Sequence, residues 1–309
     1  MTDKRLTISR LQFCATDGLI LASFAFFTLL AVLFSQQVEG WEILVVKNCG
    51  AASAYIAFTQ FSGRIRKKFW KFFFRMAGVM LAYAYLFGAV DKLQLILHGR
   101  WLDDTVLRLE QSVFGVQPTL WMERFISRPV TEWMMFSYVV YLPMYLVLCG
   151  IIDYRQGDLA LEDYFFTLGL SNVLCDLGFI LFPVAGPIPY MGSQYAVPLN
   201  GYVWTWLGEA IRHHAHFVGG TIPSPHCANA TVMWMMAYRY YRPSFWILLP
   251  IVLSLYVSTF YGRYHYITDA VAGVATAFLA LVAAPSLMRL WDVIVSRKAK
   301  TVPDLPAAS

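Results

Sequence analysis

Charged residues are scarce in this chain: only 14% of its 309 residues are Asp, Glu, Lys or Arg, whereas 58% are hydrophobic. This balance excludes a soluble globular protein, because too little polar surface is available to face water. Cysteine is scarce too. The five cysteines are odd in number and form no C-x-x-C pair, so they indicate small buried hydrophobic side chains rather than a disulfide framework or a metal site.

A signal-peptide cleavage pattern is also missing. The first apolar run, TDGLILASFAFFTLLAVLFSQ, continues without small residues at a cleavage position, so we expect a retained helix. Windows of about 20 apolar residues predict membrane spans. They cover residues 16–37, 41–62, 73–97, 130–152, 161–183, 225–241, 244–262 and 266–291. The sequence therefore predicts an all-α integral membrane protein with about eight transmembrane helices and no separate soluble domain.

The basic residues are unevenly distributed over the loops. With eight spans, sixteen of the 24 Lys and Arg residues fall on one side, six of them in the loop RIRKKFWKFFFR (Arg64–Arg75). The positive-inside rule then places both termini in the cytoplasm, and the compact loops favour a bacterial inner (plasma) membrane. Because these cations are dispersed between spans, they do not indicate nucleic-acid binding.

All six histidines lie on or beside the opposite, extracytoplasmic side. They are His98, His213, His214, His216, His226 and His265. The HHAH run at 213–216 is a weak cue for a metal, but interfacial loops also tolerate histidine, so we expect no metal site. His98 is open to the same interpretation as an ordinary loop residue.

Two histidines differ because apolar segments begin at them. His265 and Asp269 are four residues apart, so a helix places them on one face, where a carboxylate can hold one ring nitrogen and leave the other free as base or nucleophile. His226 begins another segment that runs inward from the same surface. Two helix N-termini directed at one place favour an anionic ligand, and a phosphate fits.

These residues resemble the motifs of the type 2 phosphatidic acid phosphatase superfamily, which includes lipid phosphate phosphatases and the inositol phosphorylceramide and sphingomyelin synthases. The second motif of that family, Pro-Ser-x-His, matches residues 223–226, and the third ends in His-x-x-x-Asp, which matches His265 and Asp269. The resemblance implies a six-helix lipid-phosphatase-like core over residues 73–293. Two helices and a basic cytoplasmic loop (1–72) would precede it, and a cytoplasmic tail (294–309) would follow, as in the inositol phosphorylceramide synthase-like branch.

The chain departs from the family in two places. The first motif, Lys-x6-Arg-Pro, is absent: Lys92 and Arg100 have seven residues between them, and Arg128-Pro129 has no lysine at the right distance. The Ser-Arg that opens the third motif in the phosphatases is replaced by Ser258-Thr259, which favours the synthase branch. The candidates for binding the substrate phosphate are Ser224, Arg263, Arg128, Arg100 and Lys92.

The resemblance also implies a mechanism and a substrate class. His265, oriented by Asp269, attacks phosphorus to form a phosphohistidine, and His226 protonates the departing alkoxide. We expect a lipid phosphate or phospholipid as substrate, with no cofactor and no metal. Hydrolysis and transfer of a phosphoryl-alcohol headgroup to a lipid hydroxyl use the same residues, so both stay open, and the oligomeric state is not predicted.

A proton-coupled transporter is the third functional class. Asp176 supports it, because an intramembrane carboxylate often marks function, although Asn172 one turn earlier would be a structural partner. The chain has no internal repeat and no paired broken helices of the transporter kind, which favours an enzyme.

Overall fold

The computed structural model describes residues 6–8, 11–215 and 217–301 of the chain. Apart from a short antiparallel pair of strands, β1 (Leu6–Ile8) and β2 (Leu11–Phe13), the regular secondary structure of this part of the chain is helical. The long helices are α1 (Ala15–Leu33), α2 (Trp41–Arg64), α3 (Lys68–Val90), α6 (Arg128–Gln156), α7 (Asp158–Leu181), α10 (Pro225–Tyr240), α11 (Arg242–Tyr261) and α12 (Ile267–Thr301). The shorter ones are α4 (Asp103–Phe114), α5 (Pro118–Trp121), α8 (Pro187–Met191) and α9 (Val203–Ala215), with 3-10 turns at Asp91–Leu93, Met122–Phe125 and Gly192–Gln194.

The all-α membrane fold is confirmed, since each of the eight apolar segments falls on one of the long helices. Six of the helices in the described part of the chain are long and apolar enough to cross a membrane: α1, α3, α6, α7, α11 and α12. The other two differ for physical reasons. Helix α2 carries Lys47, Asn48 and Gln60, and α10 has only 16 residues. That α2 and α10 also cross the bilayer, and that the core comprises residues 73–293, stay predictions.

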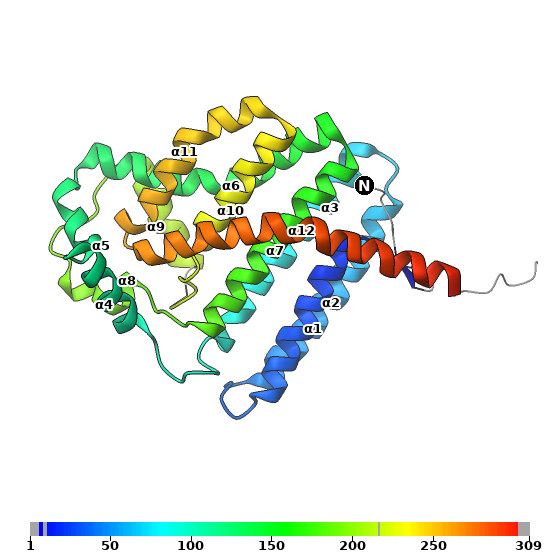
Figure 1. Cartoon of the computed structure of the whole chain (residues 1–309), viewed down its shortest axis with the longest axis horizontal. Helices are drawn as coiled ribbons and strands as arrows, with labels where there is room; N and C mark the ends of the chain where they lie inside the picture. The colour runs from blue at the N-terminus through cyan, green and yellow to red at the C-terminus, as the bar shows by residue number, and fades with distance from the viewer. Residues whose placement is uncertain (1–5, 9–10, 216, 302–309) are drawn as a thin grey trace, which may run out of the picture.

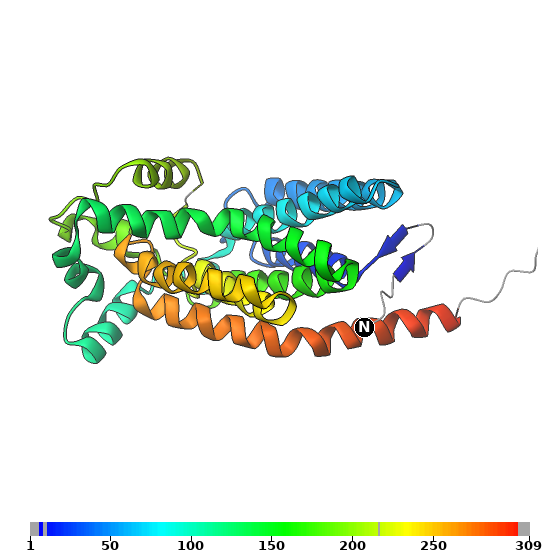
Figure 2. The ribbon, with the colours of Figure 1, turned by 90° about the horizontal axis from the view of Figure 1, so that it is seen from above.

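The two ends of the molecule are built differently. Figures 1 and 2 show α4, α5, α8 and α9 gathered at one end, whereas β1, β2 and the end of α12 lie at the other. The end with α4, α5, α8 and α9 is called the histidine end, because His226 lies in the first turn of α10 and His265 lies just before α12 there. The second, which we call the basic end, includes residues 64–75. The sequence predicts a loop there, whereas in the structure only residues 65–67 connect α2 to α3, and the first turns of α3 begin at Lys68.

Helix α10 is the central helix of the bundle and packs against α6, α7, α11 and α12. Most of its side chains are buried on all sides by other helices, so they need not be as apolar as side chains that contact lipid. Gly273 on α12 lies against Ser224 and Cys227 at the start of α10, and small residues on both helices, among them Ala228, Ala230 and Ala277, are fully buried. Small side chains let helix backbones approach closely, and in a membrane such packing holds helices together.

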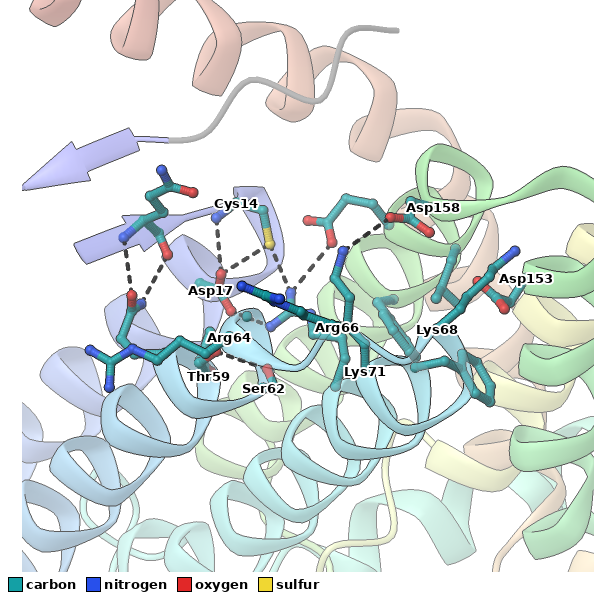
Figure 3. A pocket seen from close by; sticks show the side chains of 18 residues that line it. Cys14, Asp17, Thr59, Ser62, Arg64, Arg66, Lys68, Lys71, Asp153 and Asp158 are labelled. Atoms are coloured by element: carbon teal, nitrogen blue, oxygen red, sulfur yellow. Dashed lines mark hydrogen bonds and ion pairs between the residues drawn. The ribbon is translucent and has the colours of Figure 1, made fainter. Parts of the chain in front are cut away.

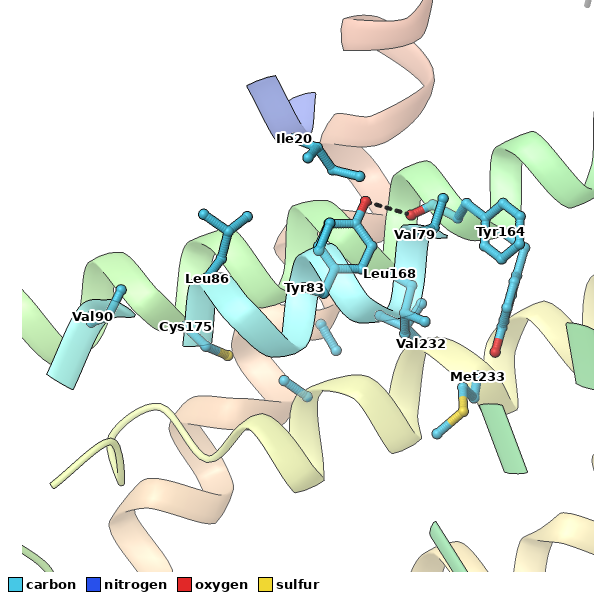
Figure 4. Packing of buried hydrophobic residues seen from close by; sticks show 14 of the residues in the cluster. Ile20, Val79, Tyr83, Leu86, Val90, Tyr164, Leu168, Cys175, Val232 and Met233 are labelled. Carbon is cyan, nitrogen blue, oxygen red and sulfur yellow. Dashed lines mark hydrogen bonds between the residues drawn. The ribbon is translucent and has the colours of Figure 1, made fainter. Parts of the chain in front are cut away.

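A continuous apolar core joins the N-terminal helices to the rest. Figure 4 shows residues of α1, α3, α7 and α10 packed together, with Ile20 and Leu86 on one side and Val232 and Met233 on the other. Within this core Tyr83 donates its hydroxyl hydrogen bond to the carbonyl of Phe165 at 3.2 Å. Helices α1 and α3 are therefore packed onto α7 rather than attached loosely beside it.

A buried polar cluster lies inside the bundle between α7 and α10. Asn229 donates to the side-chain oxygen of Asn172 at 2.7 Å, and Asn172 donates to the carbonyl of Leu168. The amide of Asn172 is thus engaged with these two residues and not with Asp176, contrary to the pairing expected from the sequence. Burial with internal partners explains how asparagines are accommodated at this depth.

The arrangement predicts that the two ends lie on opposite sides of the membrane. A cysteine introduced for exposed Gln194, at the histidine end, should react with a membrane-impermeant maleimide in intact cells. A cysteine introduced for exposed Gln156, at the other end of α6, should react only after permeabilisation. Both variants are made with exposed Cys49 replaced by serine. The reverse labelling pattern would contradict an extracytoplasmic histidine end.

Candidate active site

His265 is held in one orientation by the turn before α12. The carbonyl of Thr259 accepts hydrogen bonds from the backbone N–H groups of Tyr264 and His265, at 3.0 and 3.1 Å. The ring Nδ1 lies 3.0 Å from the carbonyl oxygen of Thr221. Because a carbonyl only accepts, Nδ1 has to carry the hydrogen, and the neutral ring then presents a lone pair on Nε2.

His226 faces that lone pair from the start of α10. Its Nδ1 lies 3.4 Å from Nε2 of His265, within reach of a shared proton. The ring is fixed by stacking on Tyr138, with centroids 4.5 Å apart, and by a tilted contact with Tyr141 at 4.9 Å. The two histidines, 39 residues apart in the sequence, are thereby brought together as the sequence predicts.

Asp269 joins the two motifs mainly through its backbone. Its carbonyl accepts the N–H of Ser224 at 2.9 Å, which ties the start of α10 to the first turn of α12. Gly273, one turn further, permits this approach, since a Cβ there would lie 2.4 Å from the carbonyl oxygen of Ser224. Ser224 itself is fully buried, and its hydroxyl accepts the N–H of Cys227 at 3.4 Å as a helix cap.

The carboxylate of Asp269 lies beside His265, at a distance longer than the sequence suggests. Oδ2 is 3.6 Å from Nδ1 and accepts the backbone N–H of Tyr266 at 2.9 Å. At that separation the carboxylate acts on the ring as a nearby charge, while Thr221 supplies the hydrogen bond. Oδ1 is buried and has no hydrogen-bond partner among the described residues. The orienting role is therefore shared between a carbonyl and a carboxylate.

A cavity of about 240 Å³ opens in front of the two rings. Its polar side chains are those of Tyr138, Arg212, Thr221, His226, Tyr264 and His265. Most of the remaining wall is apolar, formed by Phe87, Val139, Leu142, Ile211, Phe217 and Pro225. A wall of this kind favours a ligand with a hydrocarbon part, and the paired nitrogens at its floor favour a polar head.

The loop that carries Thr221 is held by a buried glutamine. The side-chain oxygen of Gln94 accepts the N–H of Gly220 at 2.6 Å, and its amide donates to the carbonyl of Val218 at 3.1 Å. Gly219 and Gly220 adopt positive φ angles of 97° and 65°, which favour glycine. Nothing in the sequence marks Gln94, because a single polar residue near a helix end has no pattern of its own.

Arg212 is the one arginine that lines the cavity in the described part of the chain, and sequence reasoning missed it. It lies on α9, whose first turn is capped by Glu132 of α6 through the N–H groups of Tyr202 and Trp204, at 2.7 and 2.6 Å. Its Nε donates to Glu209 at 2.9 Å, and this pairing raises the pKa of Arg212 above its ordinary value. A permanent cation therefore lies at the cavity wall.

The expected phosphate-binding cations are placed elsewhere. Arg263 donates to Glu123 at 2.8 Å and to the carbonyl of Val197, and its guanidinium lies 4.1 Å from the ring centre of Tyr195. It fastens the loop after α8 instead of facing the cavity. The other three cations, exposed and outside the cavity lining, are Lys92, Arg100 and Arg128.

Helix α4 stabilises the site from outside. Asp103 accepts the N–H groups of Ala185 and Gly186, at 2.8 and 3.0 Å, and the hydroxyl of Tyr266 at 3.0 Å. Glu110 accepts the N–H of Thr268 at 2.9 Å, so a carboxylate caps the start of α12. Burial raises the pKa of both carboxyls, with the hydrogen bonds opposing that shift.

His98 is the one histidine outside the cavity whose side chain the structure describes. His98 is exposed, and its Nε2 lies 3.1 Å from the carbonyl of Leu181. No group of three His, Cys, Asp or Glu side chains suited to a metal occurs among the residues that the structure describes. The side chains of His213 and His214, and all of His216, lie outside the described residues.

The sequence model of the PAP2 superfamily matches residues 104–283, which include both histidines and Asp269. The chain belongs to the PAP2 superfamily. Membership indicates a phosphatase-type membrane enzyme whose substrate is of the lipid-phosphate kind. Helices α1 to α3 precede the matched region. No curated protein and no solved structure matches the chain.

Proposed function

We propose that this PAP2 protein is a lipid phosphatase or phosphotransferase that works through a phosphohistidine at the extracytoplasmic face of the membrane. The observation that carries the proposal is the orientation of His265, whose Nε2 points at His226 on the floor of an apolar cavity. A nucleophile and a proton donor placed side by side at one end of a membrane bundle suit a phosphate ester at the depth of lipid headgroups.

The cavity supports a substrate with both a phosphate and a hydrocarbon part. Arg212 supplies a fixed positive charge for the phosphoryl oxygens in place of the missing first motif, and Phe87, Leu142 and Ile211 contact the apolar part. Substrate phosphate has to displace the present contact between the two histidines to reach Nε2, since these nitrogens are only 3.4 Å apart.

The first chemical step forms one bond and breaks another. The lone pair on Nε2 of His265 forms a bond to phosphorus, the bond from phosphorus to the alkoxide oxygen breaks, and protonated His226 gives its proton to that oxygen. The hydrogen bond from Nδ1 to Thr221 and the nearby carboxylate of Asp269 stabilise the positive charge that develops on the His265 ring.

The second step returns the enzyme to its starting form. An incoming hydroxyl oxygen attacks phosphorus and gives its proton to His226, and the nitrogen–phosphorus bond breaks so that the electron pair returns to Nε2. Water as the nucleophile gives hydrolysis. A lipid hydroxyl gives transfer of the kind carried out by inositol phosphorylceramide synthases, the branch that the loss of the family's Ser-Arg favours.

Hydrolysis and transfer are distinguished by the products that each reaction forms. Purified protein is incubated with lipid phosphate monoesters and with phospholipids, with and without a lipid alcohol acceptor, and the products are measured as free phosphate and as new phospholipid. Free phosphate without acceptor supports a phosphatase. A new phospholipid that forms only with acceptor supports a transferase, and neither product from any substrate would contradict the proposal.

His265→Ala should abolish both turnover and the trapped phosphoenzyme. Among the described residues that line the cavity, no other side chain has a ring nitrogen whose lone pair is oriented by a hydrogen bond like that from His265 Nδ1 to Thr221. The measurement is acid-labile, base-stable incorporation of label from a ³²P-labelled substrate after a rapid quench. His98→Ala, which removes an exposed histidine outside the cavity, is the matched control and should keep both. Near-normal activity of a folded His265→Ala variant would overturn the mechanism.

His226→Ala should slow formation of the phosphoenzyme by about 10²- to 10⁴-fold for an alkyl phosphate, the range for a lost general acid. An aryl phosphate needs no proton on its leaving group, so the variant should recover much of the wild-type rate with that substrate. Single-turnover rates for the two esters provide the comparison. Equal losses for both esters would show that His226 is not the acid.

Arg212→Gln should lower kcat/KM for the lipid phosphate by about 10²-fold, the loss usual for one donor to a developing phosphoryl charge. Arg108→Gln provides the control, because Arg108 is an exposed arginine at the same end that donates to Thr105 and does not line the cavity. Thermal unfolding in detergent establishes that both variants fold. A loss of the same size in the control would assign the effect to general surface charge.

A further inference from the structure

A second cavity, of about 480 Å³, lies at the basic end of the bundle. Figure 3 shows it between the start of α1, the end of α2, the start of α3 and the facing ends of α6 and α7. It shares no lining residue with the histidine cavity. The positive-inside rule places this end at the cytoplasmic surface.

The floor of this cavity is a buried ionic cluster centred on Arg75. Its guanidinium donates to Asp17 at 2.5 Å, to the hydroxyl of Tyr55 at 3.2 Å and to Glu162 at 3.4 Å. The sulfur of Cys14 lies 2.7 Å from the same group. These bonds join α1, α2, α3 and α7, so the cavity is held open by fixed partners.

The rim of the cavity carries an excess of positive charge. Arg64, Arg66, Lys68 and Lys71 face only two carboxylates, Asp153 and Asp158. Lys71 pairs with Asp158 at 3.6 Å. The other three cations, at positions 64, 66 and 68, form no ion pair with any residue that the structure describes, and all three are exposed.

The same turn exposes a cluster of aromatic side chains. Phe69, Trp70 and Phe73, on the first turns of α3, are exposed next to the basic rim, and Phe61 is exposed on the last turns of α2. Aromatic rings at this depth are typical of the boundary between headgroups and acyl chains. A soluble anion would not contact such an apolar surface, whereas the acyl chains of a lipid bound by its headgroup would pack against it.

Membrane orientation alone does not account for this construction. The positive-inside rule needs cations in the loop, but it needs neither a cavity nor a buried arginine cluster beneath it. Basic pockets between transmembrane helices on the cytoplasmic side bind anionic headgroups, because arginine and lysine donate several hydrogen bonds to phosphate oxygens.

We propose that the cavity at the basic end binds the phosphate-bearing headgroup of an anionic phospholipid from the cytoplasmic leaflet. Arg64, Arg66 and Lys68 contact the phosphate oxygens, and the acyl chains lie along Phe69 and Phe73. The lipid is a bound component and not a substrate, since this site contains no histidine. It joins the ends of α2 and α3 to α7 and so stabilises the attachment of the N-terminal helices.

The test uses the full chain in a zwitterionic detergent, with His265→Ala as background so that no lipid is consumed. Phosphatidylglycerol, phosphatidylcholine and inorganic phosphate are titrated separately, and the rise in unfolding temperature gives the affinity. The pocket variant is Arg64→Gln with Arg66→Gln. The control, Lys67→Gln with Arg289→Gln, removes the same charge from exposed positions at the same end that do not line the cavity.

We expect phosphatidylglycerol to stabilise the background protein more than phosphatidylcholine does. The pocket variant should bind phosphatidylglycerol at least about tenfold more weakly, and the control should stay within about twofold of the background. Equal weakening in both variants would reduce the effect to general surface charge and overturn the proposal. If inorganic phosphate stabilises the protein as strongly as the lipid does, the ligand of this cavity is a soluble anion and the proposal of a lipid is wrong. Neither result depends on whether the histidine end is catalytic.

Discussion

The hydrogen bond from the N–H of Ser224 to the carbonyl of Asp269 is the contact on which the site depends. It joins the first turns of α10 and α12, and it forms only because residue 273 has no side chain to separate the two backbones. Helices α10 and α12 pack against each other, and small residues on both, Ala228 and Ala277, are fully buried. Close backbone packing thus fixes the separation of the two histidines before their side chains interact.

Such close packing makes each buried polar group depend on its partner. In the interior, an unpaired hydrogen-bond donor or acceptor destabilises the folded state by about 1–3 kcal/mol. The partner of a ring nitrogen is therefore the group that the fold places beside it. His265 illustrates this, since Thr221 determines which of its nitrogens carries the hydrogen. Thr221 in turn is held by the loop that Gln94 binds. The chemistry of one imidazole therefore depends on a residue 171 positions earlier in the sequence.

The charged groups of the two cavities are arranged differently. At the histidine end most of the wall is apolar, and Arg212, the one arginine that lines it among the described residues, is paired with Glu209, which suits a lipid phosphate that enters and leaves. At the basic end the floor is a fixed ionic cluster around Arg75, and three cations of the rim form no ion pair with a residue that the structure describes, which suits a ligand that stays bound. One bundle accommodates both because its helices separate the two ends by the thickness of the apolar core.

The sequence by itself determined the all-α membrane fold and the place of His226 and His265 at or just before the starts of two helices, because apolar windows are local properties of the chain. The close approach of the two rings depends on the tertiary contact between Ser224 and Asp269. Only the tertiary structure decided which cations meet the cavity. Arg263, two residues from His265, is turned to Glu123, whereas Arg212 reaches the cavity from a helix capped by Glu132. Arg263 is held by Glu123, 140 positions earlier, and the start of α9, which carries Arg212, is held by Glu132, 70 to 73 positions earlier. Spacing along the chain does not encode such distant contacts.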